Sequence, residues 1–380
     1  MTHGTTILGQ VLKMMPRAQI ESLDHEYGTG RPSRVFSRWS QFGTLVFGQL
    51  AGRHSLRDVV TTMAAQSTAL ALLGLTPPKR STLAEANERR PATLYQTLLA
   101  ILYARCRAFA PGHGFRFKSP LFSWDSTTIS LCLSLFPWAR FRRAKGAVKV
   151  HTLLDHGGYI PAFVVLTEGK QSDITVAREL RLPRDSIVTM DRGYIDYQFL
   201  CRLTQDGVYF VTRQKVNAKF KVTARFAVDW QRGVTSDHNI VLLGPKSPAD
   251  RSMLRRVGYR HPETGKHYVF WTNAFHLAAT TIAAIYKERW QIELFFKAIK
   301  QNLKIKTFLG TSENAVMTQI WVALITYLML AFLRFQAGLG ISFQQMLRLL
   351  QINLFDRRTL VDLCHPQQRH APDGRRLCVA

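Results

Sequence analysis

The chain has 380 residues, enough for two or three domains, and 46% of them are hydrophobic, as in a globular protein. Lys and Arg number 51 against 25 Asp and Glu, and this excess of +26 makes a polyanion the expected partner. No cleavable signal segment is expected at the start, and the five widely spaced cysteines form no C-x-x-C pair, which argues for a reducing compartment and against a structural zinc site.

Residues 1–115 are expected to be helical and to form a DNA-binding domain. Residues 55–75 begin with a serine, have apolar positions at helical spacing and contain a glycine near their end. Further along, Arg89 and Arg90 lie directly before Pro91. A basic helical domain of this kind suits binding to a duplex, and a charged face exposed to solvent is the alternative interpretation.

Strand patterns dominate from about residue 119 onward. Three β-rich segments separated by short turns predict an antiparallel meander, and the next four segments alternate between helical and strand patterns. The segments, in the order βββαβαβ, are residues 121–131, 147–156, 159–169, 172–182, 186–194, 195–207 and 208–214. Hairpin-linked strands followed by parallel crossovers predict a mixed α/β sheet with helices on both faces.

The second half of the chain interrupts and then ends this pattern. Residues 216–272 contain strand-like pieces joined at turns, and we interpret them as a β insertion. A helix is expected over residues 285–300, IYKERWQIELFFKAIK. The apolar run from Trp321 to Leu333 is too short to span a bilayer and predicts a buried helix of a soluble protein. Residues 336–380 are expected to form a C-terminal helical tail.

Four polar side chains of the 285–300 segment share one stripe, about 60° wide at about 100° per residue: Tyr286, Arg289, Glu293 and Lys300. The remaining positions are mostly apolar and are expected to be buried: Ile285, Trp290, Ile292, Leu294, Phe295, Phe296 and Ile299. Such a helix directs one acid and several donors toward an anionic partner. The alternative is an ordinary Arg289–Glu293 pair on a solvated face, which stabilises a helix by about 0.2–0.5 kcal/mol.

Two aspartates complete a candidate metal site. Asp125 lies in the middle of the first strand, where an acid is out of place unless it faces a site, and Asp191 follows the fourth strand at its carboxyl end. If these strands are neighbours, the aspartates face each other, and the later helix can bring Glu293 alongside. Three carboxylates without His or Cys suit Mg²⁺ or Mn²⁺, and two such ions about 3.5–4 Å apart would drive phosphodiester displacement. Each acid taken alone also has a local alternative, as a turn cap, an Asx-turn or a surface pair.

The four stripe residues match every position of the signature Y-x2-R-x3-E-x6-K. This signature is typical of the DDE transposases of bacterial insertion sequences, specifically of the insertion-sequence-four family, which the chain resembles over about residues 30–335. Further segments are similar to other blocks of that family: WDST around Asp125, the KVH and VVLTEGKQSD segments within 149–173, and MDRGYIDYQFL at 190–200.

The resemblance implies a ribonuclease H-like catalytic domain over residues 116–335, with Asp125, Asp191 and Glu293 as the catalytic acids that bind two Mg²⁺ or Mn²⁺ ions. It implies cut-and-paste movement, in which DNA ends are cleaved through a hairpin and joined to target DNA. The implied partners are double-stranded DNA, as terminal inverted repeats and target, and a second copy of the chain in a homodimeric synaptic complex, in the bacterial cytoplasm on the nucleoid. The implied DNA-holding residues are Tyr286, Arg289 and Lys300.

Further DNA contacts are expected in or near the insertion. The resemblance implies that one aromatic side chain stacks on a flipped base, which stacking favours by about 1–3 kcal/mol. The candidates are Tyr268, Trp271 and Trp230, and a place in the core of the insertion is the alternative for each. Arg213, which closes the fifth strand, is expected to contact a phosphate. The basic run 138–149 is expected either to lie on DNA or to form a solvated loop.

Two other functions remain open. A different ribonuclease H-like nuclease, such as a structure-specific resolvase, would use the same acids on branched DNA, but it gives no reason for the stripe or the insertion. A catalytically silent DNA-binding derivative would normally have lost at least one acid, and all three are present. Inverted repeats bounded by short direct repeats around the gene would identify a transposon.

Overall fold

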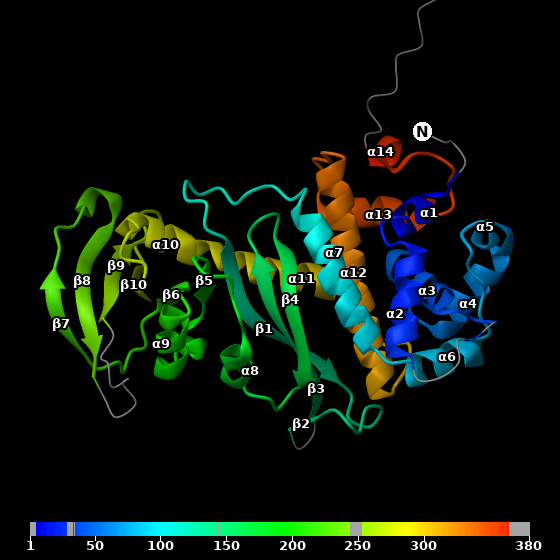
Figure 1. The fold of residues 1–380 in the computed structure, drawn as a ribbon, viewed down its shortest axis with the longest axis horizontal. Coiled ribbons are helices and arrows are strands. Elements are labelled where there is room, and N and C mark those ends of the chain that lie inside the picture. Colours follow the sequence, from blue (N-terminus) through cyan, green and yellow to red (C-terminus); the bar gives the residue numbers. More distant parts are fainter. Residues whose placement is uncertain (1–4, 29–32, 34, 143–144, 244–252, 365–380) are drawn as a thin grey trace, which may run out of the picture. The chain divides into compact units, whose positions relative to one another are not determined.

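The computed structural model describes residues 5–28, 33, 35–142, 145–243 and 253–364 (Figure 1). The chain divides into two compact units, which are described separately below. The first unit comprises Met1–Phe109 and Ala298–Ala380, and the second comprises Ala110–Lys297. The three predicted domains, 1–115, 116–335 and 336–380, stay a prediction, because compact units divide a chain by packing and not by role.

The described part of the first unit is helical. Several helices begin at a serine whose side chain accepts a backbone hydrogen bond from the first turn, as at Ser37, Ser55, Ser312 and Ser342. The helices are α1 (Ile7–Leu12), α2 (Arg17–Tyr27), α3 (Arg38–Leu50), α4 (Leu56–Ala65), α5 (Ser67–Ala71), α6 (Arg80–Arg89), α7 (Thr93–Arg107), α12 (Glu313–Gln336), α13 (Phe343–Asn353) and α14 (Leu360–Cys364).

Helix α12 is the central helix of this unit. It is the one helix among the described residues that is long and apolar enough to cross a membrane by length and composition. However, 89% of its most apolar window is buried, and it packs against α3, α6 and α7 of the same unit. The apolar run from Trp321 to Leu333 therefore forms a buried helix, as predicted.

The second unit is built on one mixed sheet, with ten strands among the described residues. The strands are β1 (Leu121–Leu131), β2 (Arg140–Arg142), β3 (Lys145–Asp155), β4 (Ile160–Glu168), β5 (Ile187–Met190), β6 (Tyr209–Arg213), β7 (Phe220–Arg225), β8 (Val234–Leu242), β9 (Met253–Arg260) and β10 (His267–Thr272). Their order is β2-β3-β1-β5-β6-β10-β9-β8-β7, and β4 pairs with β3.

The strand pairing follows the predicted order. Strands β1, β3 and β4 are antiparallel neighbours, whereas β1, β5 and β6 are parallel neighbours. The mixed α/β sheet is therefore confirmed. Within the basic run 138–149, β2 pairs antiparallel with β3, so its described part is not a loop throughout, and its contact with DNA stays a prediction.

Strands β7 to β10 occupy the segment interpreted as an insertion, residues 216–272. They extend the main sheet, because β10 pairs antiparallel with β6 at its inner edge (Figure 1). The antiparallel neighbours β9 and β8 follow, and β7 is the edge strand. A rigid connection of backbone hydrogen bonds therefore joins the insertion to the strands that carry the aspartates.

Helices cover both faces of this sheet, as predicted. Helices α8 (Asp173–Glu179) and α9 (Tyr197–Gln205) bury their apolar residues against one face, in a core that includes Trp124 and Trp271. Helix α10 (Ala279–Glu288) packs on the opposite face, in a core that includes Leu121 and Phe270. Side chains of neighbouring positions on a strand point to opposite faces, so the two cores draw on alternating residues of the same strands.

The single helix predicted over residues 285–300 is wrong in one respect. Helix α10 ends at Glu288 and α11 (Trp290–Asn302) begins two residues later, with Arg289 between them. The backbone tightens to i→i+3 hydrogen bonds there, from the Arg289 amide to Tyr286 O at 3.2 Å and from the Ile292 amide to Arg289 O at 3.2 Å.

The expected burial of the rest of this segment is also only partly correct. Ile285, Ile292, Phe295 and Phe296 are buried, as predicted. Trp290 and Leu294, in contrast, are 56% and 42% exposed. The tightened turn changes the angle between successive side chains, so a uniform step of about 100° per residue does not describe this segment.

Candidate active site

Asp125 lies in the middle of β1, level with Asp191, which directly follows the carboxyl end of the neighbouring strand β5. The parallel register of β1 and β5 pairs Trp124 with Met190, so Asp125 and Asp191 are the next residues along each strand. The condition on which the prediction depended, that these strands are neighbours, is therefore met. Asp191 leaves β5 in an extended conformation and begins a short 3-10 turn, Arg192–Tyr194, without capping it through its side chain.

The helical segment brings three stripe residues to the aspartates. The hydroxyl of Tyr286 donates to Asp191 Oδ1 at 3.4 Å. Arg289 donates through Nη1 to Asp125 Oδ2 at 3.2 Å and through Nη2 to Glu293 Oε1 at 2.5 Å. The arginine side chain is only 14% exposed, so these ion pairs are largely shielded from water. The structure thus brings together five of the predicted site residues.

Burial and like charges shape the electrostatics of this cluster. Desolvation raises the pKa of Asp125 to about 6, and the charges of Asp191 and Glu293 act in the same direction. The Ser126 amide and the Arg289 guanidinium oppose that shift. Burial also raises the pKa of Tyr286 to about 12, so this hydroxyl stays a donor at neutral pH. At Asp125, negative charge is therefore costly in this protein, and a nearby cation is favoured.

The donor set fits a hard divalent cation. All three acids offer carboxylate oxygens, which Mg²⁺ and Mn²⁺ prefer. Within the described ranges, no group of three acidic, histidine or cysteine side chains converges closely enough to hold an ion as it stands. Instead, the guanidinium of Arg289 supplies the positive charge between Asp125 and Glu293. The residues fit the charge and the ligand type of the ion, and Arg289 competes with it.

Lys300, the last residue of the signature, lies on α11 in the first compact unit. Burial lowers its pKa, and the nearby charge of Lys306 adds to this effect. Its predicted contact with a DNA end stays a prediction.

Arg213 and Tyr268 lie together on the face of the sheet that carries Tyr286. The guanidinium of Arg213 lies 5.1 Å from the centroid of the Tyr268 ring. The Tyr268 ring is nearly parallel to that of Phe270, with centroids 6.2 Å apart, and Phe270 lies 5.0 Å from Tyr286. A row of aromatic rings therefore runs from Tyr286 to Arg213, so Arg213 and Tyr268 lie on the same face of the sheet as Tyr286.

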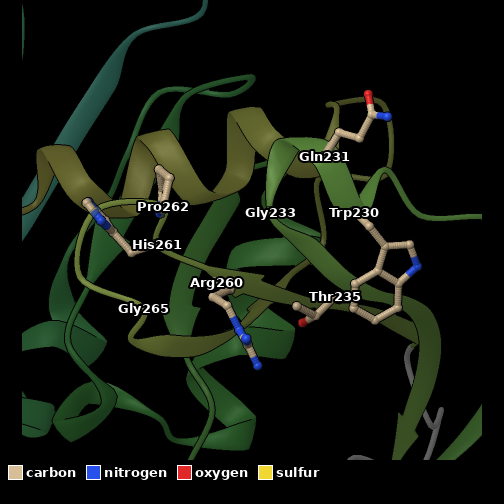
Figure 2. Close-up of a pocket in the computed structure, with 8 residues that line it drawn as sticks. All are labelled: Trp230, Gln231, Gly233, Thr235, Arg260, His261, Pro262 and Gly265. Atoms are coloured by element: carbon tan, nitrogen blue, oxygen red, sulfur yellow. The ribbon is translucent and has the colours of Figure 1, made fainter.

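The other two aromatic candidates differ sharply in exposure. Trp271 is fully buried among the residues packed against α8 and α9, so it offers no free ring face for a base in this structure. Its register explains this, because a residue next to Phe270 on β10 points to the opposite face. Trp230, in contrast, is 67% exposed and lines a pocket of about 350 Å³ together with Arg260 and His261 (Figure 2).

A second polar cluster lies next to Asp125, and the sequence analysis did not predict it. It contains Ser126, Lys149 and Asp173, all of which fall within the segments WDST, KVH and VVLTEGKQSD. A signal was present in the sequence, because each of these segments contains one of the three polar residues. Two of them, Ser126 and Lys149, lie on β-strands.

Two family models match the chain. One, described as a transposase DDE domain, covers residues 116–329, and the other, described as a domain of unknown function (DUF4372), covers residues 3–76. A solved structure, the cryo-EM structure of a piggyBac transposase synaptic complex with hairpin DNA, matches 97% of this chain and 80% of that chain. Its TM-score of 0.41 and 13% identity are too low to support an inference.

Two similar relatives cover most of the chain. A probable transposase for insertion sequence element IS5377 of Geobacillus stearothermophilus is 28% identical over 354 residues, which is 92% of this chain and 91% of that protein. A putative transposase, y4zB, of Sinorhizobium fredii is 30% identical over 296 residues, which is 76% of this chain and 81% of that protein.

Proposed function

The chain belongs to the family of transposases with a DDE domain, and on this premise we propose that Asp125, Asp191 and Glu293 are its catalytic and metal-binding acids. As a member of this family, it is an enzyme that cleaves DNA and transfers a strand. We further propose that it belongs to the insertion-sequence-four group and that its sheet is a ribonuclease H-like core. The matched signature over residues 286–300 supports the first of these, and the mixed sheet supports the second.

One observation carries the assignment of the acids. Residues far apart in the chain, on β1, after β5 and on α11, are linked by Tyr286 and Arg289 of the same signature. A surface ion pair between Arg289 and Glu293 would not require a partly buried aspartate from β1 as a second partner. The ordinary helix pair is therefore the weaker interpretation.

The acids would hold two Mg²⁺ or Mn²⁺ ions, which when bound activate a water or a 3′-hydroxyl and stabilise the leaving oxygen. The protein itself supplies the positions of the ligands. Asp125 is fixed by the Ser126 amide, and Asp191 is fixed by Tyr286. Arg289 pairs with both Asp125 and Glu293 in the absence of DNA, and its planar guanidinium suits a phosphate equally well.

The DNA end would lie along the face of the sheet that carries these residues. Arg289 and Lys300 would grip phosphates of the end, and Arg213 would contact a phosphate farther along, beside the Tyr268 ring. For a hairpin route, a flipped base needs an exposed aromatic ring. This requirement favours the exposed Trp230 first and the partly buried Tyr268 second, over the buried Trp271.

The proposed partners are the terminal inverted repeats, the target DNA and a second copy of the chain in the synaptic complex. The excess positive charge of +26 supports binding to DNA phosphates. A structure-specific resolvase is the second candidate, because the same acids would serve it, and the substrate distinguishes the two.

The test uses the purified chain, Mn²⁺ and labelled duplexes that carry the native element ends. Asp125→Asn, Asp191→Asn and Glu293→Gln are each expected to abolish cleavage and strand transfer, while end binding stays within about two-fold because affinity comes mainly from phosphate contacts. Glu263→Gln is the matched control, since Glu263 is an exposed acid in the turn between β9 and β10. Metal-dependent cleavage by any of the three variants contradicts the assignment. Activity on branched DNA and none on the ends favours the resolvase.

A further inference from the structure

The face of β1 that points away from the three acids carries an ordered polar cluster. Ser126 follows Asp125, so its side chain points to the opposite face of the sheet. Its hydroxyl donates to Asp173 Oδ1 at 2.8 Å, and Asp173 is the first residue of α8. The α8 face and the α10 face thus meet at two successive residues of one strand.

Asp173 is held in place by a second element. Lys149 of β3 donates through Nζ to Asp173 Oδ1 at 3.1 Å and to the carbonyl oxygen of Gln171 at 2.8 Å. The lysine side chain is only 14% exposed, so its position is restricted by packing as well. Lys149 fixes both Asp173 and the loop just before it, which gives the Ser126 hydroxyl a rigid acceptor.

Ser126 also connects this cluster to the active site through its backbone. Its amide donates to Asp125 Oδ1 at 2.8 Å, while the other carboxylate oxygen of Asp125 accepts from Arg289. Asp125 Oδ1 is therefore held by a backbone amide, and Asp125 Oδ2 is held by the Arg289 side chain, which competes with a metal. A rotation of the Ser126 peptide would therefore move Asp125 Oδ1, which accepts from the Ser126 amide.

We propose that Asp173 is a positioning residue of the transposase: together with Lys149 it fixes Ser126, whose amide sets the orientation of the Asp125 carboxylate. The proposal rests on the proposed function, since it needs Asp125 to be a catalytic acid. Asp173 contacts no reacting group, because it lies with α8 on the other side of the sheet. The competing explanation is that Asp173 only stabilises the start of α8, as an acid in a first helical turn.

The expected effect is on rate and not on DNA affinity. Placement errors of about 1 Å can lower a rate on the order of 100-fold. Asp173→Ala and Ser126→Ala are each expected to slow single-turnover cleavage by about 10-fold to 100-fold and to raise the Mn²⁺ concentration for half-maximal rate. The dissociation constant for an end duplex should stay within about two-fold, because phosphate contacts are unchanged.

A double-mutant comparison tests the path through Ser126. If Asp173 acts through the Ser126 hydroxyl, the Asp173→Ala/Ser126→Ala variant is no slower than the slower single variant. Asp173→Asn, which keeps an acceptor oxygen for Ser126, should recover most of the rate. Ser126→Ala is the deciding variant if Asp173→Ala does not fold, because a role of Asp173 in helix stability alone would leave its rate unchanged.

Asp196→Ala provides the matched control. Asp196 caps α9 by accepting from the Phe199 amide at 2.9 Å and pairs with Arg178 at 2.6 Å, so it is an acid at a helix start near the same face without a link to Asp125. It should lower the thermal midpoint and leave the cleavage rate within about two-fold.

Three results overturn the proposal. In the first, Asp173→Ala behaves like Asp196→Ala, with lower stability and an unchanged rate. In the second, the losses of the two single variants multiply in the double variant. In the third, Asp125→Asn, measured alongside, cleaves at the wild-type rate, and then the proposed function fails as well. If Asp125→Asn is inactive and Asp173→Ala is fully active, the positioning role of Asp173 is contradicted and the proposed function still holds.

Discussion

The two faces of strand β1 hold charge in opposite ways. On the α10 face, Asp125, Asp191 and Glu293 lie together, and a single guanidinium pairs with two of them. On the α8 face, Asp173 has Lys149 and a serine hydroxyl within hydrogen-bond distance. A group of acids with too little positive charge around it is typical of a site that binds a cation from solution. An acid that is paired with a lysine of the same chain is typical of a structural contact.

The largest expected effect is at Asp125, where substitution should change cleavage and stability in opposite directions; Asp173 provides the comparison. Asp125→Asn should reduce cleavage below detection, because the acid is a proposed metal ligand. In the metal-free, DNA-free protein at pH 7 it should nevertheless raise the free energy of unfolding by about 2 kcal/mol. Burial raises the folded pKa of Asp125 from its ordinary value of 3.8 to about 6, so the ionised form is disfavoured in the folded state; this cost grows as pH rises from the lower value and is complete above about pH 6.

Asp173→Asn should change stability in the other direction, since it removes the partner of Lys149. Chemical denaturation at pH 7 measures the change in the free energy of unfolding, which should be an increase for Asp125→Asn and a decrease for Asp173→Asn. A loss of stability in both variants would remove the difference between the faces.

The second prediction concerns the grip on DNA. Arg289→Ala and Lys300→Ala should slow hairpin formation by about 100-fold and slow the first nick less, because the hairpin step must bend the end until its 3′-hydroxyl reaches the opposite strand. Labelled end duplexes resolved on denaturing gels should therefore accumulate nicked, unhairpinned products. Equal losses of nicking and hairpin formation would mean that these side chains only stabilise the helical segment.

The third prediction uses a buried histidine beside the active face. The His156 side chain is 3% exposed, and its Nε2 forms a 2.7 Å hydrogen bond with the Ser123 hydroxyl. Burial lowers the pKa of His156 to about 3. The unfolded chain takes up this proton below about pH 6.5 and the folded chain does not, so stability is full above that pH and decreases as pH falls.

Between pH 7 and pH 5 this single group should cost about 2 kcal/mol of unfolding free energy. His156→Asn should therefore flatten the pH dependence by that amount, as measured by denaturation at each pH. An unchanged slope in the variant would show that His156 is protonated in the folded protein.

The smallest expected effect tests the competition between Arg289 and the metal. In the absence of DNA, Arg289→Gln should bind Mn²⁺ about 10-fold more tightly than the wild type, which corresponds to about 1.4 kcal/mol. The variant frees Asp125 and Glu293 from their ion pairs. Electron paramagnetic resonance of free Mn²⁺ measures this affinity, and Lys287→Gln, on the same helical segment, is the control. Weaker binding by Arg289→Gln would mean that the arginine supports the site and does not compete with the ion.

Much of the fold could be predicted because the signals are local. Alternating and helical apolar spacing placed the seven predicted strands and helices of residues 121–214 in the correct order but missed the short strand β2, and hairpin-length turns identified the antiparallel meander. The break at Arg289 could not be predicted in this way. The backbone tightens there where Arg289 reaches acids from two other elements, and a regular helical period contains no information about such partners.

The sequence by itself determined which residue types are present for chemistry: three acids, a tyrosine, an arginine and a lysine at a recognisable spacing. It also determined that β1 contains an aspartate and that a second aspartate directly follows β5, since the order of residues along the chain is covalent. Only the tertiary structure decided that Arg289 lies between Asp125 and Glu293, that Trp271 is buried, and that Ser126 turns to Asp173. Those outcomes depend on strand register and on which helix covers which face, and both are set by packing between residues far apart in the chain.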